Sequence, residues 1–594
     1  MIEAQTKTCQ NCKQPFTIEP EDFDFYEKIK VPPPTFCWLC RAQRRLTFRN
    51  ERLLYKRKSS YSGKEIFSGY PPEAPFTVYE NDVWYSDKWD ALSYGRDYDF
   101  SRPFFEQFFE LYKQVPLFAL SVVTPSNSDY CNNATGAKNY YLVFNTSYAE
   151  DCAYGNAVNY SKDCVDNSHL TNCELCYGNL WLGNSNHVLF SEECEDCIDV
   201  WFSKGLRGCT NCFGCVGLRN KNYHIWNKPV SKDDYEAWMK NFNSGSFKVI
   251  SEEQAKLNDF AVRYPVKYLR GTQNVDVSGN YIFNSKNVKK SFLVREGEDL
   301  KYCQYLQTPA NKDCYDHTTW GVGNNLTYEV CQGGQGTNNI RFCLLVYPNV
   351  RDLEYCIACG SSSDLFACVG VKNKQYCIFN KQYTKEEYES LVPKIRKHME
   401  EMPYTDNGGR VYKYGEFFPP EFSPYSYNET VAQEYFQLTR DEIEARGFVW
   451  RKGPERNYKI SLEPDNMPDD IKDVEDAILS EVIGCAHGGK CNDNCTTAFQ
   501  IIPQELAFYR RMRLPVPHFC PNCRFSERLG RRGLMKLWER TCNCAGATSG
   551  NRIHTNANQH PHGASPCNAK FETTYAPDRP EIVYCESCYN AEVA

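Results

Sequence analysis

Two groups of cysteines, one near each end of the chain, have the spacing of a zinc site. The ligand sets are Cys9, Cys12, Cys37 and Cys40 near the start, and Cys491, Cys495, Cys520 and Cys523 near the end. Each set consists of two close pairs on separate turns, which can supply four thiolates to a tetrahedral Zn²⁺. A redox CxxC motif is the alternative, but it does not explain a second pair at a repeated separation. We therefore predict one structural zinc ion in each group.

A third zinc site is predicted in the C-terminal module, and its ligands are Cys542, Cys544, Cys585 and Cys588. The aligned positions near the start of the chain hold Ser59, Glu80 and Val83 instead. Tyrosines and prolines around these three positions still match, so we expect this sub-module to keep its fold without a metal. The expected total is three structural Zn²⁺ ions per chain.

The C-terminal copy also carries an insertion, residues 545–567, that is rich in potential ligands. The candidates for an additional metal site are Cys485, His487, His560, His562 and Cys567. Imidazole and thiolate groups both suit zinc, although a polar loop without metal is the simpler interpretation. Cys485 is also the substitute for a first ligand, because Cys491-x3-Cys495 is one residue longer than Cys9-x2-Cys12.

The segments between these cysteines indicate that the two ends are copies of one module. Phe25-Tyr26 recurs as Phe508-Tyr509 at the same shift that relates Cys37 to Cys520. The agreement continues without a gap over about 45 positions. Such agreement indicates a duplicated domain, with the second cysteine pair of each copy followed by a basic segment.

The cysteine and aromatic pattern resembles a known family. Cys9-Gln10-Asn11-Cys12, Phe25-Tyr26 and Pro34-Thr35-Phe36-Cys37-Trp38-Leu39-Cys40-Arg41 are similar to the short bacterial "probable zinc-ribbon" domains. The whole layout looks like uncharacterised zinc-domain proteins of candidate-phyla bacteria. The likeness covers about 35 residues at each end. It implies zinc-ribbon or treble-clef-like modules that bind zinc, and no settled activity.

The basic segments after the second cysteine pairs are candidates for binding nucleic acid. If they are helical, one face of each carries several arginines, namely Arg45, Arg49 and Arg52 in the first copy and Arg528 and Arg532 in the second. A basic face beside a zinc knuckle can bind phosphates. Arg41 and Arg524 can instead compensate the thiolate charge, and a solvated helix face is a further alternative.

The middle of the chain repeats with a period of about 12 residues. Polar turn residues precede short apolar stretches, as in Asp151-Cys152 and Asp163-Cys164, and residues 217–227 recur as residues 370–380. Units of one strand and one turn bury a face only by stacking. We therefore predict a multidomain, mainly β protein with a central β-solenoid, similar to a parallel β-helix, whose coils hold two units, or about 24 residues. An antiparallel β-sandwich is the alternative.

The predicted solenoid has helical caps and is flanked by the small α+β zinc modules. The expected divisions are residues 1–58 for the N-terminal zinc module, 59–130 for the metal-less sub-module and linker, 131–230 and 273–383 for the two repeat arrays, 231–272 and 384–402 for helical caps with a linker, 403–480 for a connector, and 481–594 for the C-terminal double-zinc module.

The solenoid contains 18 cysteines between residues 131 and 377. Cys152, Cys164 and Cys176 are in phase with the repeat, so stacked coils would align them as an inward-facing ladder. Buried thiols act there as small hydrophobic groups. A metal cluster is the alternative, and Cys209, Cys212 and Cys215 are the place where it would form.

Composition narrows the function classes. The 594 residues include 41% hydrophobic and 24% charged residues, which is typical of a folded soluble protein. We expect neither a membrane span nor a secretory signal, because no apolar run is long enough and none precedes Cys9. The 32 cysteines then indicate the reducing cytoplasm. With a net charge of −7, affinity for nucleic acid must come from local basic faces.

These observations favour a zinc-binding, non-enzymatic protein that binds nucleic acid through its basic helices. No P-loop, GxSxG, HExxH or GxGxxG motif stands in the context that catalysis needs. Two alternatives remain: a protein–protein scaffold built on the solenoid, and a carbohydrate-binding or carbohydrate-active β-helix. The expected partners are thus nucleic acid or protein, and not a membrane.

Overall fold

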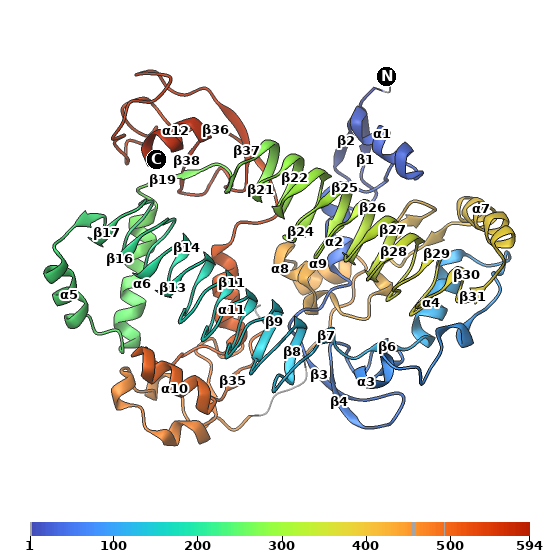
Figure 1. Cartoon of the computed structure of the whole chain (residues 1–594), viewed down its shortest axis with the longest axis horizontal. Coiled ribbons are helices and arrows are strands. Elements are labelled where there is room, and N and C mark those ends of the chain that lie inside the picture. The colour runs from blue at the N-terminus through green and yellow to red at the C-terminus, as the bar shows by residue number, and fades with distance from the viewer. Residues whose placement is uncertain (1–2, 454–457, 492–493, 594) are drawn as a thin grey trace.

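The structure is a computed structural model that describes residues 3–453, 458–491 and 494–593. It confirms the mainly β fold, with a central β-solenoid and cysteine clusters near both ends. The solenoid consists of array 1 (residues 122–229) and array 2 (residues 271–382), which lie side by side with an offset (Figure 1). Among the described helices, none has both the length and the hydropathy that a membrane span requires.

Array 1 completes one coil every 12 residues, because parallel pairing joins positions 12 apart. Asn156, Ser168 and Leu180 stand above one another in successive coils. The expected coil of about 24 residues is therefore wrong, since a single 12-residue unit already closes a turn. The strands are β7 (Val122–Val123), β8 (Tyr130–Thr135), β9 (Tyr141–Ser147), β10 (Asn156–Asn159), β11 (Ser168–Thr171), β12 (Leu180–Gly183), β13 (Asn186–Leu189), β14 (Glu192–Glu195), β15 (Ile198–Trp201), β16 (Thr210–Phe213), β17 (Asn222–Ile225) and β18 (Lys228–Pro229).

The short coil results from a backbone that turns at every third residue. Asp151, Tyr154 and Ala157 have φ values of 53°, 54° and 56°, and the pattern continues along array 1. This left-handed conformation is unfavourable for most residues by about 1–2 kcal/mol, and least so for Asn and Asp. Asn and Asp also stack between coils, as Asn139 Nδ2 donates to Asp151 Oδ1 at 2.8 Å. These requirements explain the polar turn residues of the repeat.

The residue after each corner lies in the narrow interior of the coil, where small side chains recur. Cys152, Val158 and Cys164 are fully buried there. The Sγ of Cys152 donates to the carbonyl oxygen two residues earlier at 3.2 Å, and that of Cys164 does the same at 3.2 Å. Cysteine is small and can make this weak hydrogen bond. All 18 solenoid cysteines are buried and free, which confirms the inward-facing ladder.

Array 2 has the same construction with coils of 11 to 14 residues. Its polar corner residues also stack, since Asn287 Nδ2 donates to Asp299 Oδ1 at 2.7 Å. The strands are β20 (Gly271–Thr272), β21 (Val275–Phe283), β22 (Lys286–Arg295), β23 (Gly297–Lys301), β24 (Gln304–Leu306), β25 (Asn311–Thr318), β26 (Asn325–Gly333), β27 (Thr337–Val346), β28 (Val350–Glu354), β29 (Ser363–Phe366), β30 (Gln375–Ile378) and β31 (Lys381–Gln382).

Helices follow the last coil of each array, as predicted. Helix α5 (Lys232–Asn241) begins at Ser231, whose Oγ accepts a hydrogen bond from the Asp234 amide at 3.1 Å. Helix α7 (Lys385–Glu401) begins at a capping box formed by Thr384 and Glu387. A third helix, α6 (Phe247–Ala261), follows α5.

The two cysteine-rich modules contain the same elements in the same order. The N-terminal module has β1 (Gln5–Thr8), β2 (Pro15–Ile18), α1 (Pro20–Ile29) and α2 (Trp38–Leu46), and the C-terminal module has β34 (Ile483–Gly484), β35 (Ala498–Phe499), α10 (Pro503–Met512) and α11 (Pro521–Arg531). The sub-modules that follow contain β3 (Tyr55–Lys58), β4 (Glu65–Ser68), β5 (Val78–Tyr79) and α3 (Asn81–Trp84) in one copy, and β36 (Trp538–Thr541), β37 (Lys570–Thr573), β38 (Ile582–Tyr584) and α12 (Glu586–Val593) in the other.

The remaining elements connect these parts. They are η1 (Ala91–Tyr94), α4 (Phe104–Gln114), β6 (Leu117–Phe118), β19 (Pro265–Lys267), β32 (Tyr404–Thr405), β33 (Val411–Tyr412), η2 (Pro420–Phe422), η3 (Tyr427–Glu429), α8 (Val431–Tyr435), α9 (Arg440–Ala445), η4 (Pro464–Asn466), η5 (Ile471–Asp473) and η6 (Asp476–Ser480).

The two arrays run in opposite directions. An early coil of array 1 contacts a middle coil of array 2, where Asn133 and Gln332 are hydrogen-bonded at 3.4 Å. A later coil of array 1 contacts an early coil of array 2, where the rings of Trp181 and Tyr281 stack at 4.2 Å. Figure 1 shows the same opposition, with β8 and β17 at the ends of one array and β21 and β31 at the ends of the other.

We predict that the solenoid interior rejects large side chains. Cys164→Phe should lower the free energy of unfolding by about 1–3 kcal/mol or more, because the coil has no room for the ring. The measurement is the melting temperature followed by circular dichroism. Lys162→Phe places the same ring on the exposed side of that coil and should leave the melting temperature unchanged. A Cys164→Phe protein as stable as the wild type would contradict the narrow interior.

Candidate metal centres

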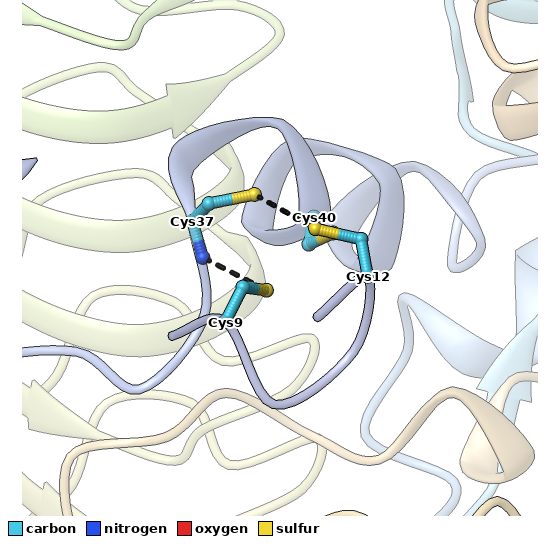
Figure 2. Close-up of side chains that lie close together, drawn as sticks. All are labelled: Cys9, Cys12, Cys37 and Cys40. Atoms are coloured by element: carbon cyan, nitrogen blue, oxygen red, sulfur yellow. Dashed lines mark hydrogen bonds between the residues drawn. The ribbon is translucent and has the colours of Figure 1, made fainter. Parts of the chain in front are cut away.

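The first metal centre is built by a hairpin and a helix of the N-terminal module. Cys9 directly follows β1 and Cys12 lies in the turn before β2, whereas Cys37 precedes α2 and Cys40 lies in its first turn. Figure 2 shows the four side chains converging. The Sγ atoms of Cys12 and Cys37 are 3.8 Å apart, and the amide of Cys37 donates to Cys9 Sγ at 3.2 Å.

The sulfur separations distinguish a metal site from a disulfide. A disulfide requires about 2.0 Å between its sulfurs, whereas the edge of a tetrahedral ZnS₄ site is about 3.8 Å for Zn–S bonds of about 2.3 Å. All four ligand atoms of this group lie within 4.8 Å of one another. Cys9, Cys12, Cys37 and Cys40 therefore form a group that could hold a metal ion.

The close approach of the sulfurs also shifts the pKa values of Cys9 and Cys40 in opposite directions. Side-chain hydrogen bonds from Cys37 and Cys40 hold the pKa of the Cys9 thiol far below its usual value. Contacts with Cys37 and Cys9 and burial raise the pKa of Cys40 well above it. An ion that binds all four sulfurs has to displace the protons that the thiols still carry.

The second centre contains Cys485 in place of Cys491. Its four sulfurs belong to Cys485, Cys495, Cys520 and Cys523, with 3.8 Å between the first and the last and 3.9 Å between the middle two. The Cys520 amide donates to Cys485 Sγ at 3.3 Å, which repeats the bond from the Cys37 amide to Cys9. Cys485 takes this place in the group because it directly follows β34, as Cys9 directly follows β1.

Cys491 belongs to a separate group. Its Sγ lies 3.6 Å from Cys523 Sγ, and His487 completes a set of three potential ligands. The structure therefore assigns the substitute ligand, Cys485, to the four-sulfur group. His487 does not join the histidines of the C-terminal insertion.

The third centre differs from its predicted set at one position. Its four sulfurs belong to Cys542, Cys567, Cys585 and Cys588, so Cys567 replaces Cys544. Cys542 directly follows β36, and the chain returns to the paired strand β37 just after Cys567, which brings these two residues together. Cys544 lies beyond the strand and joins His560, His562 and Cys588 in another group. His560 and His562 thus belong to a group of potential metal ligands, but with Cys544 and not with Cys485.

The aligned N-terminal sub-module holds a hydrogen bond where the third centre holds sulfurs. Ser59 Oγ donates to the Glu80 carboxylate, and Val83 is buried. The two sub-modules share a backbone contact, since the Ser60 amide donates to the Val78 carbonyl oxygen at 2.8 Å as the Asn543 amide does to that of Val583 at 2.9 Å. This sub-module therefore keeps its fold with a Ser–Glu contact in place of the ligand pair.

The prediction that the basic faces are exposed is wrong, because these arginines do not lie at the surface. Helix α2 ends at Leu46, so Arg49 and Arg52 lie outside it. The residues Arg45, Arg49, Arg528 and Arg532 are buried, and Arg52 is half-buried. The guanidinium groups are occupied by protein partners, as when Arg52 stacks on the Phe525 ring with its Cζ 3.4 Å from the centroid.

The arginines of the first copy are buried because the N-terminal module docks on a group of carboxylates in array 2. Arg45 Nη1 lies 3.0 Å from both Asp316 Oδ1 and Glu329 Oε2, and all three side chains are fully buried. Arg41 pairs with the same aspartate at 2.7 Å. Desolvation raises the pKa of Glu329, although Arg44 and Arg45 oppose the shift. We expected Arg41 to compensate the charge of the zinc thiolates. It instead neutralises the buried carboxylate of Asp316 in the solenoid.

The C-terminal module repeats this contact on array 1. Arg524 and Arg528 pair with Asp166 at 3.2 and 3.1 Å, as Arg41 and Arg45 pair with Asp316. The Arg528 Nε donates to Ser168 Oγ at 3.4 Å, and the Arg45 Nε donates to Thr318 Oγ1 at 3.0 Å. Both aspartates stand in the same short sequence, Asp163-Cys-Val-Asp166 and Asp313-Cys-Tyr-Asp316. This repeated motif is the signal that sequence reasoning missed.

No family model matches this chain, and no curated protein is similar to it. The resemblance of the two ends to zinc-ribbon domains therefore stays a prediction that rests on their cysteine and aromatic residues.

We predict that Cys485, and not Cys491, holds the second ion. Cys485→Ser should remove one metal ion per chain, because it deletes a sulfur of the four-membered group. Cys491→Ser is the matched control and should retain that ion. The measurement is the number of metal ions per chain, determined by inductively coupled plasma mass spectrometry. Loss of the ion from the Cys491 variant alone would contradict the assignment.

Proposed function

We propose that this chain is a zinc-binding, non-enzymatic scaffold protein. The observation that carries the proposal is the repeated docking of α2 and α11, whose arginines fill equivalent buried carboxylate sites on the two arrays. A helix used in this way supports the structure of the solenoid and leaves no basic face for a polyanion. The rigid outer surface of the arrays is then the part of the molecule that meets a protein partner.

Zinc is the ion that this proposal assigns to the centres. The groups consist of cysteines and of cysteines with histidines, which are the ligands of structural zinc sites. Binding at such sites contributes directly to folding. The free thiols inside the solenoid suit a reducing compartment, so we assign the chain to the cytoplasm.

One helix connects the first zinc centre to its docking site on the solenoid. Cys37 caps α2 and Cys40 lies in its first turn, directly before Arg41 and Arg45. The ion thereby fixes the start of the helix that aims the arginines at Asp316. Without the ion, the helix loses its anchor, and an unpaired carboxylate stays buried in array 2.

The sub-modules complete the assembly by joining the ends of the arrays. At one end, Lys372 of array 2 donates to the Trp84 carbonyl oxygen at 3.0 Å, with its Nζ 3.5 Å from the Trp84 ring centroid. At the other, Arg219 of array 1 donates to Tyr589 Oη at 3.2 Å. Each sub-module also pairs with the strand that leads into the opposite array, as β5 pairs with β6 and β38 pairs with β19. Together these contacts link the arrays at both ends (Figure 1).

We predict that the buried arginines contribute strongly to stability. Arg45→Ala and Arg528→Ala should each lower the free energy of unfolding by about 3–5 kcal/mol, because each leaves a buried aspartate with less compensation. Arg440→Ala is the control, since Arg440 is an exposed arginine paired with Glu444. The measurement is the melting temperature. Unchanged melting of both buried-arginine variants would contradict the docking role.

The function itself is tested with purified full-length protein. Labelled single- and double-stranded oligonucleotides should not bind at low salt, because the five candidate arginines are occupied. A protein that copurifies from native cells after nuclease treatment should rebind the purified chain, and chelation of zinc should abolish this binding. Oligonucleotide binding that weakens steeply with salt would restore the nucleic-acid hypothesis, and retention on glycan arrays would favour the carbohydrate hypothesis.

A further inference from the structure

The C-terminal sub-module contains two groups of potential metal ligands that share one residue. One group consists of Cys542, Cys567, Cys585 and Cys588, and the other of Cys544, His560, His562 and Cys588. We propose that they form a dinuclear zinc centre in which the Cys588 thiolate bridges both ions. This inference rests on zinc as the ion of the proposed function, and it raises the expected total from three ions to four.

The distances within the second group fit a mixed sulfur and nitrogen site. Cys544 Sγ lies 3.0 Å from His560 Nδ1, and Cys588 Sγ lies 3.3 Å from His562 Nε2. The corresponding edge of a tetrahedron is about 3.5 Å, for a Zn–N bond of about 2.0 Å and a Zn–S bond of about 2.3 Å. In the first group, the sulfurs of Cys567 and Cys585 are 3.8 Å apart, as expected for two thiolates on one ion.

Hydrogen bonds fix the ligand nitrogen of each histidine. His560 Nε2 lies 3.1 Å from Glu592 Oε1, so its Nδ1 is the nitrogen that faces Cys544. The second ring is held at the other nitrogen, because His562 Nδ1 lies 2.6 Å from the Ser565 carbonyl oxygen. A histidine that binds a metal through one nitrogen usually donates through the other to a carboxylate or carbonyl oxygen. Both rings have this arrangement.

Glu592 is itself held in place for this role. Its two carboxylate oxygens accept hydrogen bonds from the Ala557 and Asn558 amides, both at 3.0 Å. It also contacts His554 Nε2 at 3.1 Å. Because these bonds join α12 to the insertion, they bring His560 to Cys544 and Cys588 from a segment without regular secondary structure.

The number of ligands and their charge both favour a shared thiolate. Two tetrahedral ions need eight coordination positions, and the seven side chains fill them only if one sulfur binds both ions. Five thiolates and two neutral imidazoles then leave a net charge of about −1 on two Zn²⁺ ions, against about −2 for an isolated four-thiolate site. Cys588 lies in the first turn of α12, where the helix dipole stabilises a thiolate.

The first experiment is zinc analysis of the full-length wild-type chain, which should contain four ions. The double variant His560→Ala/His562→Ala should contain three, because the second ion of the pair loses both nitrogens. His224→Ala is the control and should keep four, since His224 lies in β17 of array 1 and belongs to neither group. Three ions in the wild type would overturn this inference and leave the proposed zinc function intact, whereas a wild type without zinc would overturn both.

The second experiment tests the bridge itself. After exchange of zinc for ¹¹³Cd, two cadmium resonances of the full-length chain should show scalar coupling to each other through the Cys588 sulfur. The double histidine variant should lose one resonance and the splitting of the other. Four cadmium resonances without mutual coupling would overturn the shared thiolate.

Discussion

The structure depends on buried arginine–carboxylate pairs between the metal modules and the solenoid. Asp316 and Glu329 are fully buried in array 2, and Asp166 is buried in array 1. Charges in such places are strongly unfavourable without partners of opposite sign. The partners come from helices that begin at a four-sulfur centre, so the position of each guanidinium depends on the local fold around that centre. This dependence makes the metal centres structural parts of a much larger assembly.

The order of the parts along the chain makes these contacts long-range. The N-terminal module docks on array 2 and the C-terminal module docks on array 1, with the same residue types in the same roles. The sub-modules add a second exchange, because each one joins the strand before one array to the end of the other. The two arrays are therefore held in their opposite directions by four separate parts of the chain. These contacts therefore add to the stability that each array gains from its own narrow interior.

Sequence reasoning found the parts of this structure that depend on local spacing. Paired cysteines marked the centres, and the 12-residue period marked the solenoid and its cysteine ladder. It failed where the outcome depends on residues distant in sequence. Arg45 and Arg528 looked like a solvated basic face because nothing near them in sequence shows the aspartates that cover them. Cys544 was paired by proximity in sequence, whereas the return of the chain to β37 brings Cys567 instead. The coil length was misjudged because left-handed corners at every third residue are unusual for residues other than glycine.

The central claim is that the metal centres hold the solenoid arrays together, and hydrogen–deuterium exchange of the full-length chain with and without a zinc chelator tests it most directly. Strands β25 and β26 contain Asp316 and Glu329 but no residue of a metal group. The account predicts that chelation increases exchange in α2 and also in these strands, because loss of the helix exposes their carboxylates. Faster exchange confined to the cysteine modules, with β25 and β26 still fully protected, would contradict it.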